Sequence, residues 1–285
     1  MLRGEQVAEC VDLCAFVSYP EEFARPPGLR GEIPFASSTA TGTVAIYDDH
    51  AVVAFAKTGG RDIFEHIASW LSNLNCRPYD PDGSRWSHTY RGIVHHGFAT
   101  GLDSVWHELS PVVAKVARDV PVVLTGYSRG AAMAQLASAR FYDETGRIYP
   151  TCTFASPKVG NREFCSHHPG VLRVENGSDL VPFLAPGPAI SATLRNIPLL
   201  NRLVPDDKTV YENTGSLWFI DWDGDLQRLA NWEVALMRAA RWATMAEVVF
   251  DFKDYFSEMR INDIPFFVDH VIKGYIAGLR QLDAL

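Results

Sequence analysis

The sequence predicts an α/β protein with one mostly parallel sheet that carries helices on both faces. Short apolar runs alternate with helical segments through the middle of the chain, and several of these runs are apolar on both of their faces. The length of 285 residues lies close to the upper range that a single α/β domain reaches. We therefore expect one domain over residues 1–285.

The first part of the chain presents the predicted elements in a simple order. A helix is expected over residues 5–17, and the prolines and glycines of 20–34 predict an irregular connection. Two β-rich runs, 43–47 and 51–57, flank a polar turn and predict a hairpin. The alternation continues with a strand at 120–125, a helix at 129–142, and strands at 149–155 and 171–175.

The pattern loosens after residue 181. Prolines recur through 182–205, a weak strand is expected at 217–220, and a long helical stretch runs from residue 226 to about 256. Its apolar stripe predicts a helix that faces the core; alternatively, residues 226–258 form an inserted cap whose stripe lines a pocket or meets lipid. The stripe consists of Trp232, Leu236, Ala239, Ala240, Ala243 and Val249. A final helix is expected over residues 265–285.

Charge and composition exclude several classes of function. With 26 basic against 34 acidic residues, the net charge of −8 offers no broad positive surface to nucleic acid. The five cysteines are not spaced as zinc pairs, and Cys10 and Cys14 are expected in the core, so no metal or cofactor is predicted. No apolar run reaches the roughly 20 residues that span a bilayer, so no transmembrane segment is expected. Without a classical signal peptide the expected location is cytoplasmic, with signal-independent export left open.

Residues 126–130 read Gly-Tyr-Ser-Arg-Gly, a G-x-S-x-G motif centred on Ser128. An apolar strand precedes the motif and an alanine-rich helix follows it, which is the arrangement that presents a serine hydroxyl at the edge of a sheet. In such a strained turn the strand and helix backbones approach closely, so the positions two before and two after the serine must be glycine or very small. The sequence therefore predicts a nucleophilic serine.

A serine hydroxyl needs a base and an acid that orients the base. In proteins with this motif the acid follows the serine and the histidine follows the acid, which favours His270 and disfavours His95 and His96. Asp179 lies in the turn that leaves the predicted strand 171–175, at the strand end where open α/β sheets place their chemistry. The acids held in reserve are Glu175, Asp206 and Asp207. Asp269 is too close to His270 in sequence to orient it.

An ester carbonyl that is attacked develops an oxyanion, which needs two N–H donors. One is expected from the backbone of Arg129, the residue after the serine. The second is expected from Thr58, which directly follows the predicted strand 51–57 and precedes Gly59 and Gly60. Its hydroxyl offers a further donor; the alternative for Thr58 is a plain turn residue.

These residues and four further motifs resemble the class 3 lipase family, in sequence order from about residue 44 to 270. The further motifs are residues 94–98, 153–161, 176–182 and 269–270. The resemblance implies the α/β-hydrolase fold, a triad of Ser128, Asp179 and His270, and Thr58 in the oxyanion hole. The chain departs from the family pattern at Lys57, at Arg129, where leucine is common, and at Ala155, where glycine is common. The 91 residues from Asp179 to His270 are a long interval for compact members of the family.

In that family a lid follows the oxyanion strand. Residues 59–74 predict an amphipathic helix with a glycine hinge, and this segment is the candidate lid; the alternative is a static surface helix. Its apolar positions are Ile63, Ile67, Trp70, Leu71 and Leu74.

The sequence thus predicts a serine carboxylester hydrolase that cleaves acylglycerol-type esters through an acyl-enzyme. Its expected partners are a lipid or other ester substrate and, transiently, a lipid interface. The alternatives are phospholipase A1 or acyltransferase activity and, from a different class, a hydrolase-like binding module without catalysis. Chain-length preference and oligomeric state are not predicted.

Overall fold

Eight strands form one sheet in the part of the chain that the structure describes, and their spatial order is their sequence order. The structure is a computed structural model that describes residues 2–57, 78–168, 170–179, 181–183, 211–240 and 269–281. The strands are β1 (Gly31–Ala36), β2 (Thr41–Ile46), β3 (Ala51–Phe55), β4 (Val122–Tyr127), β5 (Thr151–Phe154), β6 (Val171–Asn176), β7 (Ser216–Ile220) and β8 (Leu226–Arg228). The helices are α1 (Gly4–Ser18), α3 (His96–Val116), α4 (Arg129–Thr145), α5 (Arg162–His167), the 3₁₀ turn η1 (Val181–Phe183) and α9 (Ile272–Leu279).

The centre of the sheet is parallel, as the sequence predicts. Strands β3 to β7 pair in parallel, whereas β1, β2 and β3 pair antiparallel at one edge and β8 pairs antiparallel with β7 at the other. Parallel strands all end at the same side of a sheet, so the residues that follow the C-terminal ends of β4 and β6 lie on one side of the molecule. The candidate site forms at these C-terminal strand ends.

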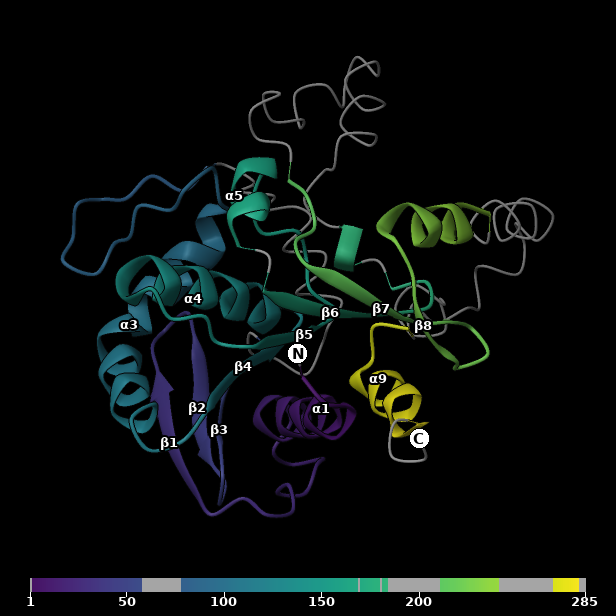
Figure 1. Cartoon of the computed structure of the whole chain (residues 1–285), viewed down its shortest axis with the longest axis horizontal. Coiled ribbons are helices and arrows are strands. Elements are labelled where there is room, and N and C mark those ends of the chain that lie inside the picture. Colours follow the sequence, from purple (N-terminus) through teal and green to yellow (C-terminus); the bar gives the residue numbers. More distant parts are fainter. Residues whose placement is uncertain are drawn as a thin grey trace, which may run out of the picture.

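Helices cover both faces of the sheet (Figure 1). Alternate residues of the central strands pack in opposite directions, because successive side chains of a strand point to opposite faces. Val53 and Leu124 join the cluster under α3 and α4, whereas Val52 and Val123 join the cluster under α1 and α9. Cys10 and Cys14 of α1 are buried in the second cluster, as predicted.

The predicted irregular connection over residues 20–34 is wrong at its end, where β1 begins at Gly31 and contains Pro34. A proline is compatible with this strand because β1 lies at the sheet edge and pairs only with β2.

The predicted helix over residues 226–256 is also wrong at its start. Residues 226–228 form β8, and the described part of the helix covers residues 231–240. Trp232 and Leu236 are 69% and 64% exposed, so the outer face of this helix is not core; Val234 and Arg238 are its buried residues. Ala239 and Ala240 are exposed too, while Ala243 and Val249 lie outside the described residues.

The last helix is shorter than predicted in the part that the structure describes. It begins at Ile272, and His270 lies in the turn before it rather than inside the helix.

Helix α1 is attached to the β2–β3 hairpin through His50. The imidazole Nε2 lies 2.6 Å from Glu9 Oε1, Nδ1 lies 2.7 Å from Asp49 Oδ1, and the ring stacks on Tyr47. Burial lowers the pKa of His50, but the hydrogen bonds and charges of Asp49 and Glu9 outweigh burial, so the pKa is raised above its usual value. The pair of carboxylates therefore favours the charged imidazolium.

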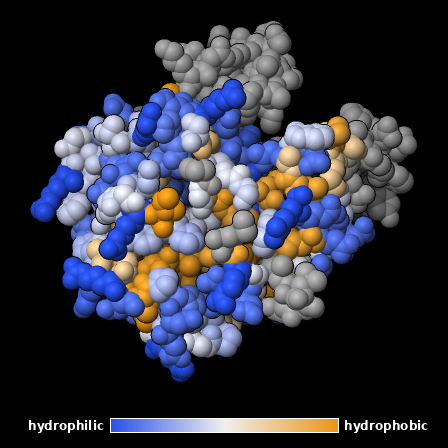
Figure 2. Space-filling model, in the orientation of Figure 1, coloured by the Kyte–Doolittle hydropathy of each residue, from blue (hydrophilic) through white to orange (hydrophobic). Residues whose placement is uncertain are grey.

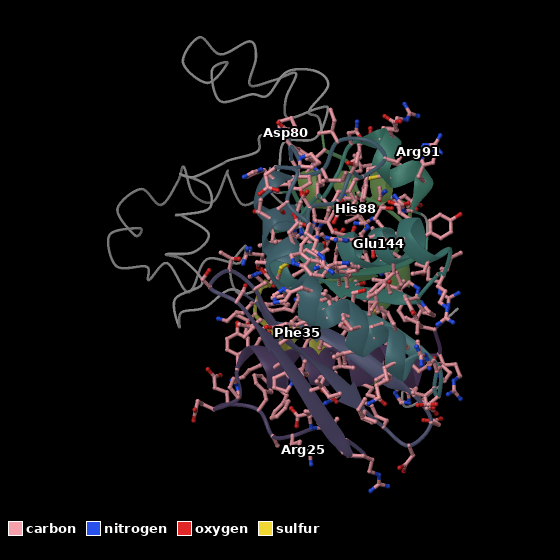
Figure 3. All side chains as sticks on the ribbon, turned by 90° about the vertical axis from the view of Figure 1, so that its left-hand side faces the viewer. Arg25, Phe35, Asp80, His88, Arg91 and Glu144 are labelled. Carbon is pink, nitrogen blue, oxygen red and sulfur yellow. The ribbon has the colours of Figure 1, made fainter. Side chains whose placement is uncertain are left out.

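The segment before α3 is attached to α4 by a second histidine. Figure 3 shows His88 and Glu144 close together on the side that α3 and α4 cover. His88 Nε2 lies 3.1 Å from Asp143 Oδ2, and Arg140 bridges Glu144 and Asp103 at 2.7 and 2.8 Å. These contacts position the chain that leads into the first turn of α3.

Candidate active site

Ser128 lies in a strained turn between β4 and α4. Its φ of 57° and ψ of −124° belong to a region that residues with side chains rarely adopt. The Ser128 N–H donates to the Phe154 carbonyl at 2.9 Å, and its carbonyl accepts from the Ala131 N–H at 3.0 Å. The side chain is partly exposed and stands before the first turn of α4. This is the position that the G-x-S-x-G motif predicts.

The two glycines of the motif allow this turn to close. A Cβ added to Gly126 would lie 2.3 Å from the carbonyl carbon of Gly130, and one added to Gly130 would lie 2.2 Å from the Phe55 carbonyl oxygen. Both distances are far inside van der Waals contact, so the sequence argument for small residues at these positions is correct. The contact with Phe55 also places the end of β3 against the start of α4.

Arg129 begins α4 directly after Ser128. Its backbone N–H belongs to the first turn of the helix, whose amides carry the positive end of the helix dipole. Its side chain extends to the carbonyls of Thr39 and Gly97, the latter at 3.3 Å, and burial lowers the pKa of the guanidinium. The side chain therefore connects the start of α4 with the start of α3 and the β1–β2 turn.

Asp179 and His270 are brought together although they are 91 positions apart in the sequence. His270 Nδ1 lies 3.0 Å from both Oδ1 and Oδ2 of Asp179. Asp179 is 0% exposed and His270 is 2% exposed, so the pair is shielded from water and the contact is not weakened by solvent. A carboxylate at Nδ1 favours the proton on that nitrogen and leaves Nε2 as the basic atom.

Two further donors hold the carboxylate of Asp179. The Tyr275 hydroxyl donates to Oδ2 at 2.6 Å, and the Val181 N–H donates to Oδ1 at 2.8 Å. Burial, followed by the charge of Asp179, raises the pKa of Tyr275 well above its usual value, so the phenol keeps its proton. Tyr275 is not among the residues predicted from the sequence; its only sequence signal is its place five residues after His270.

Tyr127 connects the serine turn with the histidine. Its ring stacks on the His270 ring with centroids 5.2 Å apart, and its hydroxyl donates to the His270 carbonyl. Tyr127 is the residue before Ser128, so this contact brings the two candidate residues to the same edge of the sheet. In the part of the chain that the structure describes, the Ser128 hydroxyl makes no hydrogen bond to the His270 ring.

Asp269 joins the two loops rather than orienting His270. Its Oδ2 accepts from the Ser178 N–H at 2.5 Å, and its carbonyl accepts from Asn176 Nδ2 at 2.9 Å. Gly177, at φ 38°, lies against this carboxylate, where a Cβ would come within 2.5 Å of Oδ2. Burial raises the pKa of Asp269.

The remaining predicted residues are not part of this group. Glu175 is in buried ion pairs with two arginines, and Asp206 and Asp207 lie outside the described residues. Thr58 and the candidate lid 59–74 also lie outside them. His95 is buried beside Phe98, and burial lowers its pKa to about 4.

A cavity of about 810 Å³ lies at the opposite edge of the sheet, at the first residues of β5, β6 and β7. Figure 2 shows hydrophobic surface across the middle of the visible face, where the N-terminus lies in Figure 1. Leu2, Val171 and Trp218 are among the residues that line the cavity. It is remote from Ser128, because it lies where these parallel strands begin, whereas Ser128 follows the end of β4.

The described residues contain no group of three histidine, cysteine, aspartate or glutamate side chains arranged to hold a metal ion. No helix among them combines the length and the apolar character that crossing a membrane requires.

The chain is similar to known lipases. Residues 60–188 match the family model described as lipase (class 3). A Rhizomucor miehei triacylglyceride lipase matches at 18% identity over 77% of this chain and 80% of that one, with a TM-score of 0.54. Lipase II from Rhizopus niveus matches at 18% identity over 76% and 80%, with a TM-score of 0.56. A Penicillium expansum triacylglycerol lipase matches at 14% identity over 76% and 79%, with a TM-score of 0.52. These matches and the mostly parallel sheet identify the α/β-hydrolase fold.

Proposed function

Since residues 60–188 place the chain in the class 3 lipase family and so among the carboxylic ester hydrolases, we propose that it cleaves acylglycerol-type esters with Ser128, His270 and Asp179. The observation that carries the proposal is the buried Asp179–His270 pair. The ring of Tyr127, the residue before the strained Ser128, stacks on the His270 ring and so connects this pair with the serine turn. A serine in a strained turn, at the same side of the sheet as an oriented imidazole, is the arrangement that serine hydrolases use to attack an acyl carbon.

In the first half of the reaction, His270 Nε2 removes the proton of Ser128 Oγ as the oxygen bonds to the ester carbonyl carbon. The negative charge moves to the carbonyl oxygen, where the N–H groups of Arg129 and Thr58 stabilise it. The bond to the alcohol then breaks, and the departing alkoxide takes the proton from His270. Asp179 keeps its negative charge throughout and stabilises the imidazolium.

In the second half, His270 removes a proton from water, and the resulting hydroxide attacks the acyl-enzyme. The bond to Ser128 Oγ breaks, the serine recovers its proton from His270, and the carboxylic acid leaves. The three donors to Asp179 support this cycle, because they hold the carboxylate in place while the imidazole charges and discharges.

The first test uses a fluorophosphonate probe and a Ser128→Ala variant. The wild type should be labelled once and should hydrolyse p-nitrophenyl esters, whereas Ser128→Ala should bind no probe and lose activity by about 10³-fold or more while staying folded. A wild-type protein that is neither labelled nor active would instead favour the binding module without catalysis.

A substrate panel separates the remaining alternatives. Triacylglycerols, phospholipids and p-nitrophenyl esters of several chain lengths distinguish a triacylglycerol lipase from a phospholipase A1. Adding an acceptor alcohol distinguishes hydrolysis from acyl transfer, since a transferase would form the new ester in preference to the free acid.

We also propose that a lipid surface is met by the outer face of the helix at residues 231–240. Trp232 and Leu236 lie one helical turn apart, and both are mostly exposed. Exposed tryptophan and leucine on one helix face are typical of segments that enter the interfacial region of a membrane.

The candidate lid at 59–74 remains a prediction, and a jump in rate when substrate exceeds its solubility is the measurement that checks it.

A further inference from the structure

We propose that Arg238 is a positioning residue for the acid turn, which we define as residues 176–179, and that it acts on the reaction through Asp179. The proposal rests on the proposed ester hydrolysis by Ser128, His270 and Asp179. Arg238 lies on the helix at residues 231–240, in the long interval between the candidate acid and the candidate base. It is 1% exposed.

One guanidinium contacts the residue before the acid turn and the first two residues of the turn. Arg238 Nη1 lies 2.7 Å from Glu175 Oε2, Nε donates to the Gly177 carbonyl at 2.6 Å, and Nη2 donates to the Asn176 carbonyl at 3.4 Å. The planar arrangement of five N–H donors suits this set, because the acceptors face the guanidinium from several directions at once. A lysine at the same position would reach fewer of them.

The N–H groups of the same turn are held by other parts of the chain. The Gly177 N–H donates to the Ile220 carbonyl at 2.8 Å, and the Ser178 N–H donates to Asp269. Trp222 Nε1 donates to Ser178 Oγ at 2.9 Å. The turn is thus fixed through its carbonyls by Arg238 and through its N–H groups by β7 and the residue before His270.

This arrangement sets the direction in which Asp179 leaves the turn. Without the guanidinium, the Gly177 carbonyl loses the donor that holds it, and the Asn176 carbonyl keeps only the Asp179 N–H, at 3.0 Å, so the turn must rotate to find another donor. A shift of about 1 Å in a positioning group costs up to roughly a hundredfold in rate, because the proton-transfer geometry is lost. Loss of Arg238 should therefore lower kcat while it leaves the binding of substrate, and hence KM, nearly unchanged.

Arg173 provides a matched control within the same buried network. It is also 1% exposed and also pairs with Glu175, through Oε1. Its other hydrogen bonds in the described part of the chain go to the Thr214 carbonyl, at 2.7 Å, and to Asn231. Removing Arg173 therefore disturbs the ion pair without touching the carbonyls of the acid turn.

The experiment compares Arg238→Gln, Arg238→Lys and Arg173→Gln by kcat and KM for p-nitrophenyl butyrate. Rates are divided by the number of serines that a fluorophosphonate titrates, so that a loss of folded protein does not count as a loss of kcat. We expect Arg238→Gln to lose kcat by about tenfold to a hundredfold, with KM within about twofold of the wild type. Arg238→Lys should recover part of the loss, and Arg173→Gln should stay within about threefold of the wild type.

Equal kcat per titrated serine in Arg238→Gln and Arg173→Gln would overturn the inference, and so would a loss confined to KM. If the glutamine variants do not fold, Arg238→Lys against Arg173→Lys makes the same comparison. Ser128→Ala separates the two levels of the argument. Wild-type activity in Ser128→Ala would remove the proposed function itself, whereas an inactive Ser128→Ala with a fully active Arg238→Gln would remove only the role of Arg238.

Discussion

Replacing Tyr275 by phenylalanine removes one oxygen atom from the centre of the candidate site. The hydroxyl donates to Asp179 Oδ2 at 2.6 Å and accepts from the Asn176 N–H at 3.2 Å. The ring packs edge-on against Tyr127 and Phe154, and a phenylalanine ring keeps both contacts. Because Tyr275 is fully buried, water cannot replace the hydroxyl. The variant therefore tests the two hydrogen bonds and little else.

The expected loss follows from the partners of the hydroxyl. A hydrogen bond to a charged acceptor contributes about 1.5–3 kcal/mol, and leaving the buried Asn176 N–H without its acceptor adds about 1 kcal/mol. The free energy of unfolding should thus fall by about 2.5–4 kcal/mol. Asp179 keeps the Val181 N–H and His270 as partners, so activity should survive with kcat reduced by about tenfold.

Urea unfolding at pH 7.5 measures the first quantity, and hydrolysis of p-nitrophenyl butyrate measures the second. Tyr142→Phe is the control, since it deletes the same atom from a tyrosine that is 44% exposed. Because folding raises the pKa of Tyr275, the contribution of its hydroxyl to the free energy of unfolding is complete below about pH 10, the pKa of an unfolded tyrosine. This contribution is lost as the pH rises through the pKa of the folded state. A Tyr275→Phe protein as stable and as active as Tyr142→Phe would refute the reasoning.

Three further changes have definite expected outcomes. His50→Asn should destabilise the protein by about 1–2 kcal/mol at pH 6 and by less at pH 9. Because folding raises the pKa of His50, the histidine stabilises the folded protein below the unfolded pKa of about 6.5, and this contribution is lost as the pH rises through the folded pKa. Urea unfolding at both pH values measures the difference. Gly130→Ala should cost about 3 kcal/mol or more, because its methyl group would meet the Phe55 carbonyl; a soluble variant with an unchanged melting temperature would contradict the packing argument. Trp232→Ser with Leu236→Ser should slow hydrolysis of emulsified triacylglycerol severalfold and leave the kcat/KM for a dissolved short-chain ester unchanged; equal effects on both substrates would exclude lipid contact by this face.

Local sequence determined the parts of the protein whose physical causes are local. The apolar run before Ser128, the small residues around it and the alanine-rich segment after it predict a strand, a strained turn and a helix, and the structure has all three there. Chain order and a turn at a strand end were enough to select Asp179 and His270, which lie 3.0 Å apart. The same local reasoning failed for Pro34, because only the neighbours of a strand decide whether its N–H groups are needed.

Tertiary structure decided what surrounds these residues. The contacts of Asp179 with Tyr275 and of Glu175 with Arg238 join residues 96 and 63 positions apart, so no spacing or periodicity in the chain announces them. The exposure of Trp232 and the burial of Arg238, both on the helix at residues 231–240, are the reverse of what hydrophobicity predicts. The physical reason is that hydrogen-bond partners and burial depend on which elements meet, and a buried ion pair with satisfied carbonyls can hold an arginine inside while an apolar face stays outside.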